Sequence, residues 1–327
     1  MSFLTSSLVD KISKLCEGLS IPNSLFINAN MRPKKDKILV DGDVMPYDFH
    51  KYHALGNDYI VIDPNKTELN MTPANIKLIC HRHFGIGSDG ILYGPILEKD
   101  TFRLRIFNPD GSEAEKSGNG IRIFTKYLVD AHYLTGKRVF LDTLGGRVGV
   151  EVLDEKANWL RVDMGTVTFR SDEIPVSGKS REVVNEILTV GTDSLRVTCL
   201  SIGNPHCVIP VRKVSEDLVK KMGPLIEHHS LFPNRINMQL LEVVNRSLIK
   251  IEIWERGAGY TMASGSSSCA AASAAYRLGL VDPLIKVEMP GGTIDIDIHP
   301  DGHVFMTGAV SSVARGEFSE EFWKQLR

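Results

Sequence analysis

The sequence repeats itself at an offset of 147 positions, and this repeat limits the possible folds more than any other feature. The matching positions carry glycine turns beside strand-like runs or open a helical pattern: Gly56-Asn57-Asp58 with Gly203-Asn204-Pro205, Asn108 with Glu255, and Ser117-Gly118 with Ser264-Gly265. Further on, "VFLDTLGGRVGVEV" resembles "IKVEMPGGTIDIDI", and each predicts two strands joined by a glycine turn. These ordered matches predict two homologous α+β domains.

The predicted domains cover residues 49–165 and 166–327, and residues 1–48 form an extension. Each domain is expected to contain strands, one helix introduced by glycine, and more strands. The second helix, with the small residues of "CAAASAAYRLG", is expected to be enclosed by sheet, whereas "IRIFTKYLVDAHYL" has the pattern of an amphipathic helix. In the extension, apolar residues at helical spacing predict an element for packing or for oligomerisation, such as a homodimer: Leu4, Leu8, Ile12, Leu15 and Leu19.

The composition favours a globular protein that binds a small molecule. The 327 residues are 43% hydrophobic and 24% charged, and the chain is long enough for two domains. The formal net charge of -2 provides no broad attraction for nucleic acid or for an anionic membrane. No apolar run reaches the roughly 20 residues of a membrane-spanning helix, and the start of the chain lacks the layout of a secretory signal. The expected compartment is therefore the cytosol.

The cysteines indicate reduced thiols, because five is an odd number and their spacing follows no disulfide framework. Cys80-His81-Arg82-His83 could suggest a metal, but no second ligand pair has zinc-like spacing, so the end of a helix before a glycine turn is expected. Cys207 and Cys269 are predicted to lie in the core. We therefore expect no metal site.

Both predicted helices begin at a Ser-Gly pair, Ser117-Gly118 and Ser264-Gly265. A helix N-terminus has four backbone N–H groups without intrahelical partners and carries about half a positive charge, so a glycine-rich approach can receive an anion. Serine is also a preferred N-cap, and capping is the alternative interpretation of each serine. If both helix starts face one cleft, the serines approach one ligand from opposite sides.

Polar side chains suited to a zwitterionic ligand stand at the loop ends of the predicted strands: Asn57, Asn108, Asn204, His206, Asn237, Glu255 and Arg256. A single asparagine in a turn usually bonds nearby backbone, but these residues are distributed over both related halves. The amides offer hydrogen bonds, and an arginine can hold a carboxylate at two points. The set therefore favours an amino-acid site.

Ordered motifs resemble the diaminopimelate epimerase family of cofactor-independent amino-acid racemases and epimerases: "HALGNDYIVID", "HFGIGSDGI", "FNPDGSEAEKSGNGIR", "GNPHCVI", "NRINMQL" and "WERGAGYTMASGSSSCAAA". The resemblance implies two pseudo-symmetric domains, each a curled mixed or antiparallel sheet around a central helix, with the substrate between them. It also implies proton transfer at the α-carbon of diaminopimelate or a related amino acid, in lysine and cell-wall precursor biosynthesis. The extension lies outside the resemblance.

The same resemblance assigns roles to individual residues. The substrate's distal and amino-acid groups would be bound by Asn57, Asn108, Asn204, Asn237 and Arg256. The α-carboxylate would receive N–H groups from Gly118, Asn119, Gly265 and Ser266. His206 and Glu255 would be the acid–base partners of two central catalytic residues. The family has cysteine at both central positions, where this chain has Ser117 and Ser264.

Replacement of both thiols changes the chemistry that the site can perform. A thiol of ordinary pKa about 8.5 forms a thiolate beside a helix N-terminus and a base, whereas a serine needs a base to take its proton. Three interpretations stay open: an isomerase in which Ser117 and Ser264 work with His206 and Glu255, a silent amino-acid-binding homologue, and an isomerase that uses Glu255 or His206 as base on another substrate.

Other positions near the expected site also differ from the usual family sequence, and they leave the substrate open: Gly90, Tyr260 and Ser266. "GIGSDG", at residues 85–90, lacks the full dinucleotide-binding pattern, and the sequence has no phosphate loop. We therefore expect no cofactor.

Overall fold

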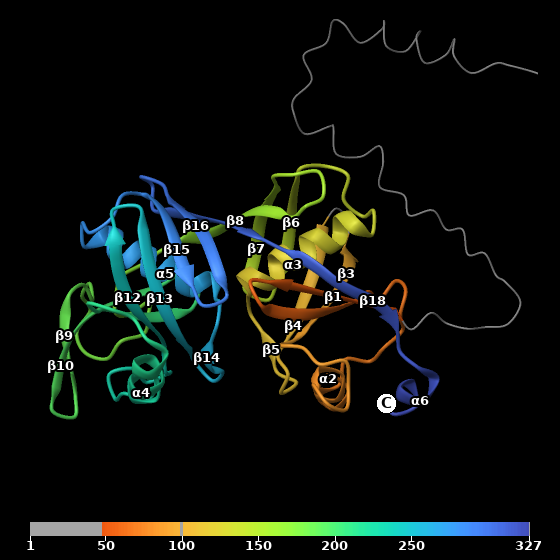
Figure 1. The fold of residues 1–327 in the computed structure, drawn as a ribbon, viewed down its shortest axis with the longest axis horizontal. Helices are drawn as coiled ribbons and strands as arrows, with labels where there is room; N and C mark the ends of the chain where they lie inside the picture. The colour runs from red at the N-terminus through yellow and green to blue at the C-terminus, as the bar shows by residue number, and fades with distance from the viewer. Residues whose placement is uncertain (1–47, 99–100, 327) are drawn as a thin grey trace, which may run out of the picture. The chain divides into compact units, whose positions relative to one another are not determined.

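A computed structural model describes residues 48–98 and 101–326 of the chain, which belong to one compact unit spanning 44–327. The predicted helical extension and Cys16 lie outside the described residues. In the described residues, eighteen strands form one hydrogen-bonded network. All but β18 belong to two groups, which we call the first lobe (β1–β8 with α2 and α3) and the second lobe (β9–β17 with α4 and α5) (Figure 1). The two lobes follow one another along the chain.

The first lobe has eight strands in the pairing order β1-β2-β3-β4-β6-β7-β8, with the short β5 on β4. Their bounds are β1 (Asp48–Ala54), β2 (Asn57–Ile62), β3 (Ile91–Glu98), β4 (Thr101–Phe107), β5 (Glu113–Ala114), β6 (Arg138–Thr143), β7 (Gly146–Val152) and β8 (Trp159–Thr166). Two pairs are parallel, β2 with β3 and β4 with β6, and the helices α2 (Pro73–Cys80) and α3 (Gly118–Asp130) lie on these connections.

The second lobe repeats this order as β10-β11-β12-β13-β15-β16-β17, with β14 on β13 and β9 on β10. Its strands are β9 (Glu186–Val190), β10 (Asp193–Ser201), β11 (Pro205–Pro210), β12 (Asn237–Asn245), β13 (Leu248–Glu255), β14 (Gly259–Thr261), β15 (Leu284–Met289), β16 (Gly292–Ile298) and β17 (His303–Ala309). The parallel pairs β11–β12 and β13–β15 are connected through α4 (Glu216–Glu227) and α5 (Gly265–Arg277). The predicted pseudo-symmetric α+β fold is confirmed.

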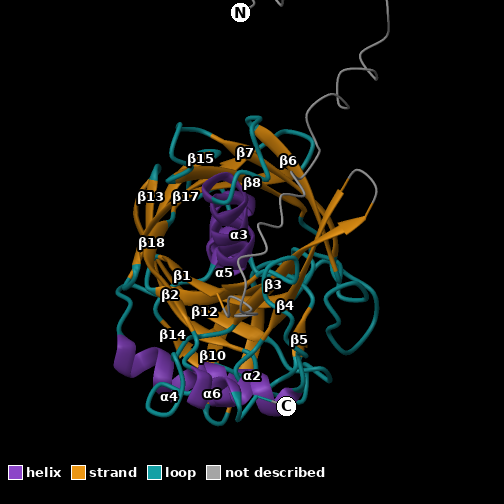
Figure 2. Ribbon diagram, turned by 90° about the vertical axis from the view of Figure 1, so that its right-hand side faces the viewer, coloured by secondary structure: helices purple, strands orange, loops and turns teal. Residues whose placement is uncertain are grey.

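Each lobe encloses one helix within its sheet, α3 in the first and α5 in the second (Figure 1), and Figure 2 shows α3 surrounded by strands. The small side chains of α5 explain its place, since residues Ser267–Ala275 are all buried. The prediction of an amphipathic α3 is wrong, because residues Gly118–Leu128 are buried on every side. Polar members of this helix find internal partners, as when the Lys126 ammonium donates to the Lys156 carbonyl at 2.7 Å.

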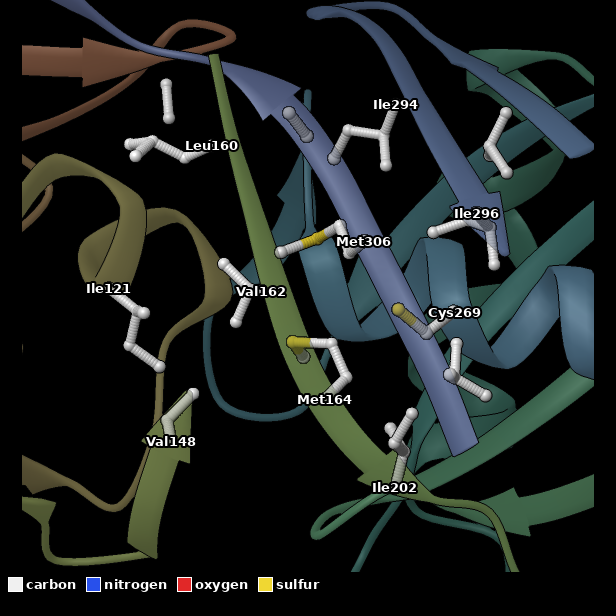
Figure 3. Close-up of a cluster of buried hydrophobic side chains, with 14 of the residues drawn as sticks. Ile121, Val148, Leu160, Val162, Met164, Ile202, Cys269, Ile294, Ile296 and Met306 are labelled. Carbon is white, nitrogen blue, oxygen red and sulfur yellow. The ribbon is translucent and has the colours of Figure 1, made fainter. Parts of the chain in front are cut away.

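Two strand pairings connect the halves of the fold. In β8, Val162 lies opposite Val150 of β7 and Met306 of β17, so the sheets of both lobes are continuous there. Figure 3 shows the side chains of Met164 and Met306 from these strands between the two enclosed helices. The last strand, β18 (Ser311–Glu317), pairs with β1, and the short α6 (Glu320–Trp323) follows it.

The C-terminal strand therefore completes the first lobe although it follows the second lobe in sequence. Phe318 is 3% exposed, and its ring centroid is 5.1 Å from that of Phe49. The domain bounds 1–48, 49–165 and 166–327 stay a prediction, and strand pairing alone would group β18 with the first lobe. Among the described helices, none is long and apolar enough to cross a membrane.

Candidate functional site

The N-termini of α3 and α5 meet. A side-chain carbon added to Gly118 would lie 3.5 Å from the Gly265 Cα atom, and one added to Gly265 would lie 3.4 Å from the Gly118 Cα atom. The Met306 side chain packs against this contact, since its sulfur would be 2.7 Å from the carbon added to Gly265. Glycine at both positions lets the two helix starts come this close without displacing the Met306 side chain, which fits the glycine that follows each serine.

Ser117 and Ser264 cap these helices, as one interpretation of the sequence predicts. The Ser117 Oγ accepts the Gly120 N–H at 3.0 Å, and the Ser264 Oγ accepts the Ser267 N–H at 3.4 Å. Both residues have extended backbone, so each hydroxyl stands directly before the first helical turn. Capping thus brings one hydroxyl from each lobe to the region where the two helices touch.

The two helix starts carry partial positive charge. Two helix N-termini contribute partial positive charges, and neither first turn contains an acidic residue. Arg122 of α3 is 0% exposed, and among the described residues no carboxylate forms an ion pair with it. Its guanidinium donates instead to the Asn119 Oδ1 at 2.9 Å, and burial lowers its pKa to about 10. An anion that reaches these two helix starts would be stabilised there.

The backbone N–H groups that could receive such an anion belong to the first residues of the two helices. Within the described part of the chain, no hydrogen bond uses the N–H of Gly118, Asn119, Gly265 or Ser266. Side-chain bonds hold the two first turns in register, since the Asn119 Nδ2 donates to the Ala263 carbonyl at 3.4 Å. These four N–H groups could therefore receive a carboxylate, and that role stays a prediction.

Glu255 supplies a carboxylate next to Ser264. It ends β13, where Glu255 pairs with Gly259 of β14 across a tight turn. Burial raises the pKa of Glu255 above its ordinary value of 4.5, although the neighbouring hydroxyls of Ser264 and Thr261 favour the ionised form. The charge of Asp89, from the first lobe, adds to the increase. A carboxylate of raised pKa beside a helix start can act as a general base.

His206 is close to the α5 start but is bonded to its own strand end. Its Nε2 lies 2.9 Å from the Asn204 Oδ1, and the Asn204 Nδ2 donates to the Ser266 Oγ at 3.4 Å. The ring is fully buried, and burial lowers the pKa of His206 to about 3, opposed by the Gln239 side chain. His206 is thus neutral, and it orients Asn204 toward the helix start.

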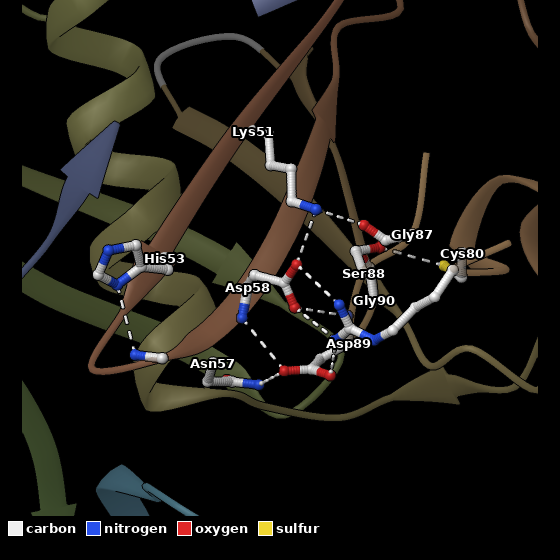
Figure 4. A network of polar contacts seen from close by, with 11 residues as sticks. Lys51, His53, Asn57, Asp58, Cys80, Gly87, Ser88, Asp89 and Gly90 are labelled. Atoms are coloured by element: carbon white, nitrogen blue, oxygen red, sulfur yellow. Dashed lines mark hydrogen bonds and ion pairs between the residues drawn. The ribbon is translucent and has the colours of Figure 1, made fainter. Parts of the chain in front are cut away.

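Asn57 belongs to a polar network at the start of the first lobe (Figure 4). Its Nδ2 donates to the Asp89 Oδ2 at 3.0 Å, and its Oδ1 accepts from the Asn119 Nδ2 at 3.0 Å. Arg82 binds both Asp58, at 2.8 Å, and Asp89, at 2.6 Å. Although burial acts to raise it, hydrogen bonds from Arg82 and Lys51 lower the pKa of Asp58. The network fixes Asn57 and Asn119 side by side.

Three of the residues predicted to bind the substrate form their hydrogen bonds with groups other than the two helix starts. The Asn108 Nδ2 donates to Ser112 within its own turn at 2.9 Å. Asn237 is 5% exposed and joins two loops, since it donates to the Pro205 carbonyl and accepts the Arg256 N–H. Arg256 is exposed, and its guanidinium contacts the Asn234 carbonyl at 3.2 Å. Among the described residues it has no carboxylate partner, so it is open to one from a ligand.

The structure adds residues that sequence reasoning did not select, namely Tyr59, Asp89 and Arg122. The Tyr59 hydroxyl lies 3.2 Å from the Ser117 Oγ, which no spacing in the sequence indicated. Gly90 departs from the usual family sequence, and a side-chain carbon there would lie 2.7 Å from the Tyr59 ring. Cys207 and Cys269 are fully buried, as predicted, and Cys80 ends α2. The described residues contain no cluster of potential metal ligands.

The sequence matches a known family over most of its length. The family profile "Diaminopimelate epimerase" matches residues 49–170 and 198–313. "Diaminopimelate epimerase 2" of Nostoc sp. is 52% identical over 276 residues, covering 84% of this chain and 96% of that protein. "Diaminopimelate epimerase" of Moorella thermoacetica is 39% identical over 274 residues, covering 83% and 98%.

A solved structure shares the fold. A probable proline racemase from Agrobacterium radiobacter K84, crystallised with bound carbonate, superposes with a TM-score of 0.62. The alignment covers 84% of this chain and 93% of that protein, at 13% sequence identity. At this identity the likeness concerns the fold, and the family assignment depends on the sequence relatives.

Proposed function

The chain belongs to the diaminopimelate epimerase family of isomerases, and on this premise we propose that it transfers a proton at the α-carbon of an amino acid without a cofactor. The proposed substrate is diaminopimelate, interconverted between its LL and meso forms. One observation carries the proposal: the N-termini of α3 and α5 touch at Gly118 and Gly265, each capped by a serine hydroxyl. Its place in metabolism would be the synthesis of lysine and cell-wall precursors.

Substrate binding uses the partial positive charge at the helix starts. The α-carboxylate receives the N–H groups of Gly118, Asn119, Gly265 and Ser266, which lack partners among the described residues. The remaining ends of the substrate bind the amides of Asn57, Asn204, Asn237 and Asn108 and the exposed guanidinium of Arg256. Of these, Asn57 and Asn204 have the best support, because each is bonded to a residue of a helix start, Asn119 and Ser266.

Proton transfer needs one group on each face of the α-carbon, and the two lobes supply them. From the second lobe, Glu255 acts as base beside Ser264, because burial and the charge of Asp89 raise the pKa of its carboxyl. From the first lobe, Ser117 faces the opposite side of the carbon. His206 holds Asn204 and remains neutral, since burial lowers its pKa to about 3.

A second candidate is a silent amino-acid-binding protein, and the two serines favour it. An aliphatic hydroxyl loses its proton far less readily than a thiol, so the step that removes a hydrogen from carbon is the one most weakened by Ser117 and Ser264. The binding groups would be unaffected. Both candidates predict binding of the amino acid, and only the isomerase predicts exchange.

Hydrogen exchange in D2O separates the candidates. The protein, incubated with diaminopimelate or with single common amino acids, is expected to incorporate solvent deuterium at the α-carbon, as measured by NMR. Glu255→Gln should decrease exchange by about 10²- to 10⁴-fold, and Ser117→Cys with Ser264→Cys should increase it by a similar factor. Calorimetric binding without deuterium in the parent protein would identify the silent binder. No gain from the two thiols would show a pocket rebuilt for another reaction.

The proposal includes a cytosolic location and a homodimer, without nucleic acid or membrane as partner. The buried free thiols Cys80, Cys199, Cys207 and Cys269 suit a reducing compartment. Sedimentation of the full chain, compared with a chain that starts at Asp48, tests whether residues 1–47 contribute to assembly.

A further inference from the structure

Tyr59 reaches the helix start of the first lobe from the neighbouring strand. It lies on β2, two residues after Asn57, so both side chains point to the face of the sheet that covers α3. The ring is 7% exposed, and its hydroxyl is 3.2 Å from the Ser117 Oγ. Within the described residues, this is the hydroxyl's only hydrogen bond.

The number of hydrogen atoms on the two hydroxyls limits how Tyr59 and Ser117 can bond to one another. A serine hydroxyl has one hydrogen and two acceptor positions, and the Gly120 N–H at 3.0 Å occupies one of the latter. If Tyr59 donates to the second position, the Ser117 hydrogen has no acceptor among the described residues. The pair then forms a short chain of hydroxyls whose last hydrogen is available to a ligand.

The neighbouring residues pack closely around the phenol ring of Tyr59. A side-chain carbon at Gly90 would lie 2.7 Å from the Tyr59 Cε1 and 2.5 Å from the Phe107 carbonyl oxygen, so no larger residue fits beside the ring. Tyr59 is also close enough to Glu255 for the carboxylate charge to raise its pKa. Tyr59, from the first lobe, is thus within electrostatic reach of the proposed base of the second lobe.

The phenol of tyrosine gives up a proton more readily than the hydroxyl of serine. Delivery of the Ser117 proton by itself would leave an alkoxide, because an aliphatic hydroxyl is about as weakly acidic as water. The ordinary pKa of tyrosine is 10.0, and burial raises the pKa of Tyr59 to about 12. Charge left on Tyr59 is therefore less costly than charge left on Ser117, and the phenol is protonated at neutral pH.

We propose that Tyr59 is a positioning residue that supplies a proton through Ser117. The Glu255 carboxylate takes the α-hydrogen as a proton, and the electron pair of the broken C–H bond stays on the substrate. Ser117 gives its proton to the opposite face of the carbon and receives the phenol proton of Tyr59, which leaves a phenolate. Water then carries the proton from Glu255 back to Tyr59. This inference rests on the proposed function, since it needs proton transfer at carbon.

Tyr59→Phe tests the relay because it removes one oxygen and keeps the ring. In D2O, inversion at the α-carbon is expected to fall by about 10²-fold or more, whereas exchange with retention, through Glu255 alone, continues within a few-fold of the parent. Ser117→Ala should give the same pattern, and the double variant should be no worse than Ser117→Ala. Tyr93→Phe, on the adjacent β3, is the matched control and should leave both rates unchanged.

The outcomes separate the relay from the function on which it depends. No deuterium in the parent protein with any substrate would overturn the proposed function and the relay together. If the parent protein shows exchange, either of two results in Tyr59→Phe would overturn the relay alone. One is an inversion rate equal to that of the parent, and the other is an equal decrease in exchange and inversion. Circular dichroism and thermal unfolding of each variant show whether an equal loss of exchange and inversion arises from unfolding of that variant.

Discussion

At the residue scale, His206 makes the stability of the protein depend on pH. Its ring is 0% exposed, and burial lowers its pKa to about 3 from an ordinary 6.5. Between these values the unfolded chain binds a proton that the folded protein does not. The free energy of unfolding therefore falls as the pH decreases below 6.5, by about 1.4 kcal/mol per pH unit. In His206→Gln, we expect this slope to be smaller by about that amount between pH 6 and 4.

Denaturant unfolding at several pH values measures the difference in slope between the parent and His206→Gln. The comparison is needed because Glu255 acts in the opposite direction: burial raises its pKa, so its contribution to stability increases as the pH falls through that pKa. Equal slopes in the two proteins would show that His206 is accessible to protons while folded. His206 would then be available as an acid in the reaction, as the sequence suggested.

Single residues of the site could be predicted where local sequence determines them. The Ser-Gly pairs identified both N-caps, because capping depends on the residues next to the helix start. Tyr59 and Ser117 could not be paired in this way, since they are 58 positions apart and a tyrosine in a strand normally indicates core. The role of Asp89 is not predictable from the sequence either, because Asn57 and Arg82 contact it only in the folded protein.

At the scale of elements, the contact between the two helix starts depends on glycine. A side-chain carbon at Gly265 would lie 2.7 Å from the Met306 sulfur and 3.4 Å from the Gly118 Cα atom. Gly265→Ala is therefore expected to lower the free energy of unfolding by about 1–3 kcal/mol, as overpacked cores do. The substitution should also move apart the two helix starts that form the proposed carboxylate site, so the KM for exchange should increase. Denaturant unfolding and exchange kinetics measure both effects.

Gly136→Ala is the control for this substitution, because the nearest atom to an added carbon is 4.0 Å away. It should change stability by less than about 0.5 kcal/mol. A double-mutant cycle of Gly265→Ala with Met306→Ala should show coupling, since the smaller residue removes the closest contact. Additive losses in that cycle would indicate that the helix starts can move apart without involving β17.

The order of the elements was predictable because the repeat determines it. Each half was expected to run from strands through one helix to more strands, and β1–β8 and β10–β17 follow that order with α3 and α5 in equivalent places. The enclosure of α3 was not predictable, because Arg122 and Lys126 suggest a solvent-facing side, and each also has a partner far along the chain, Met306 for Arg122 and Lys156 for Lys126. Periodicity indicates a helix, but it does not indicate what surrounds a buried cation.

At the scale of the whole molecule, the last strand connects the stability of both lobes. β18 pairs with β1, and β8 pairs with β17, so the first lobe is attached to the second at two edges. Phe318, just after β18, is 3% exposed and packs on Phe49. Phe318→Ala should lower the free energy of unfolding by about 3–5 kcal/mol. Because the strand network is continuous, both lobes should unfold in one transition at the lower midpoint.

Hydrogen exchange followed by mass spectrometry tests this coupling, since peptides from β2 and from β12 report on separate lobes. In Phe318→Ala, the slowest amides of both strands should lose protection by a similar factor, because they exchange through the same global opening. Phe140→Ala, on β6 and 60% exposed, is the matched control and should leave protection unchanged. Loss of protection in β2 with parental protection in β12 would mean that the lobes open independently. The two serines of the proposed site could then approach one another and move apart while both lobes stay folded, because each lobe supplies one of the serines.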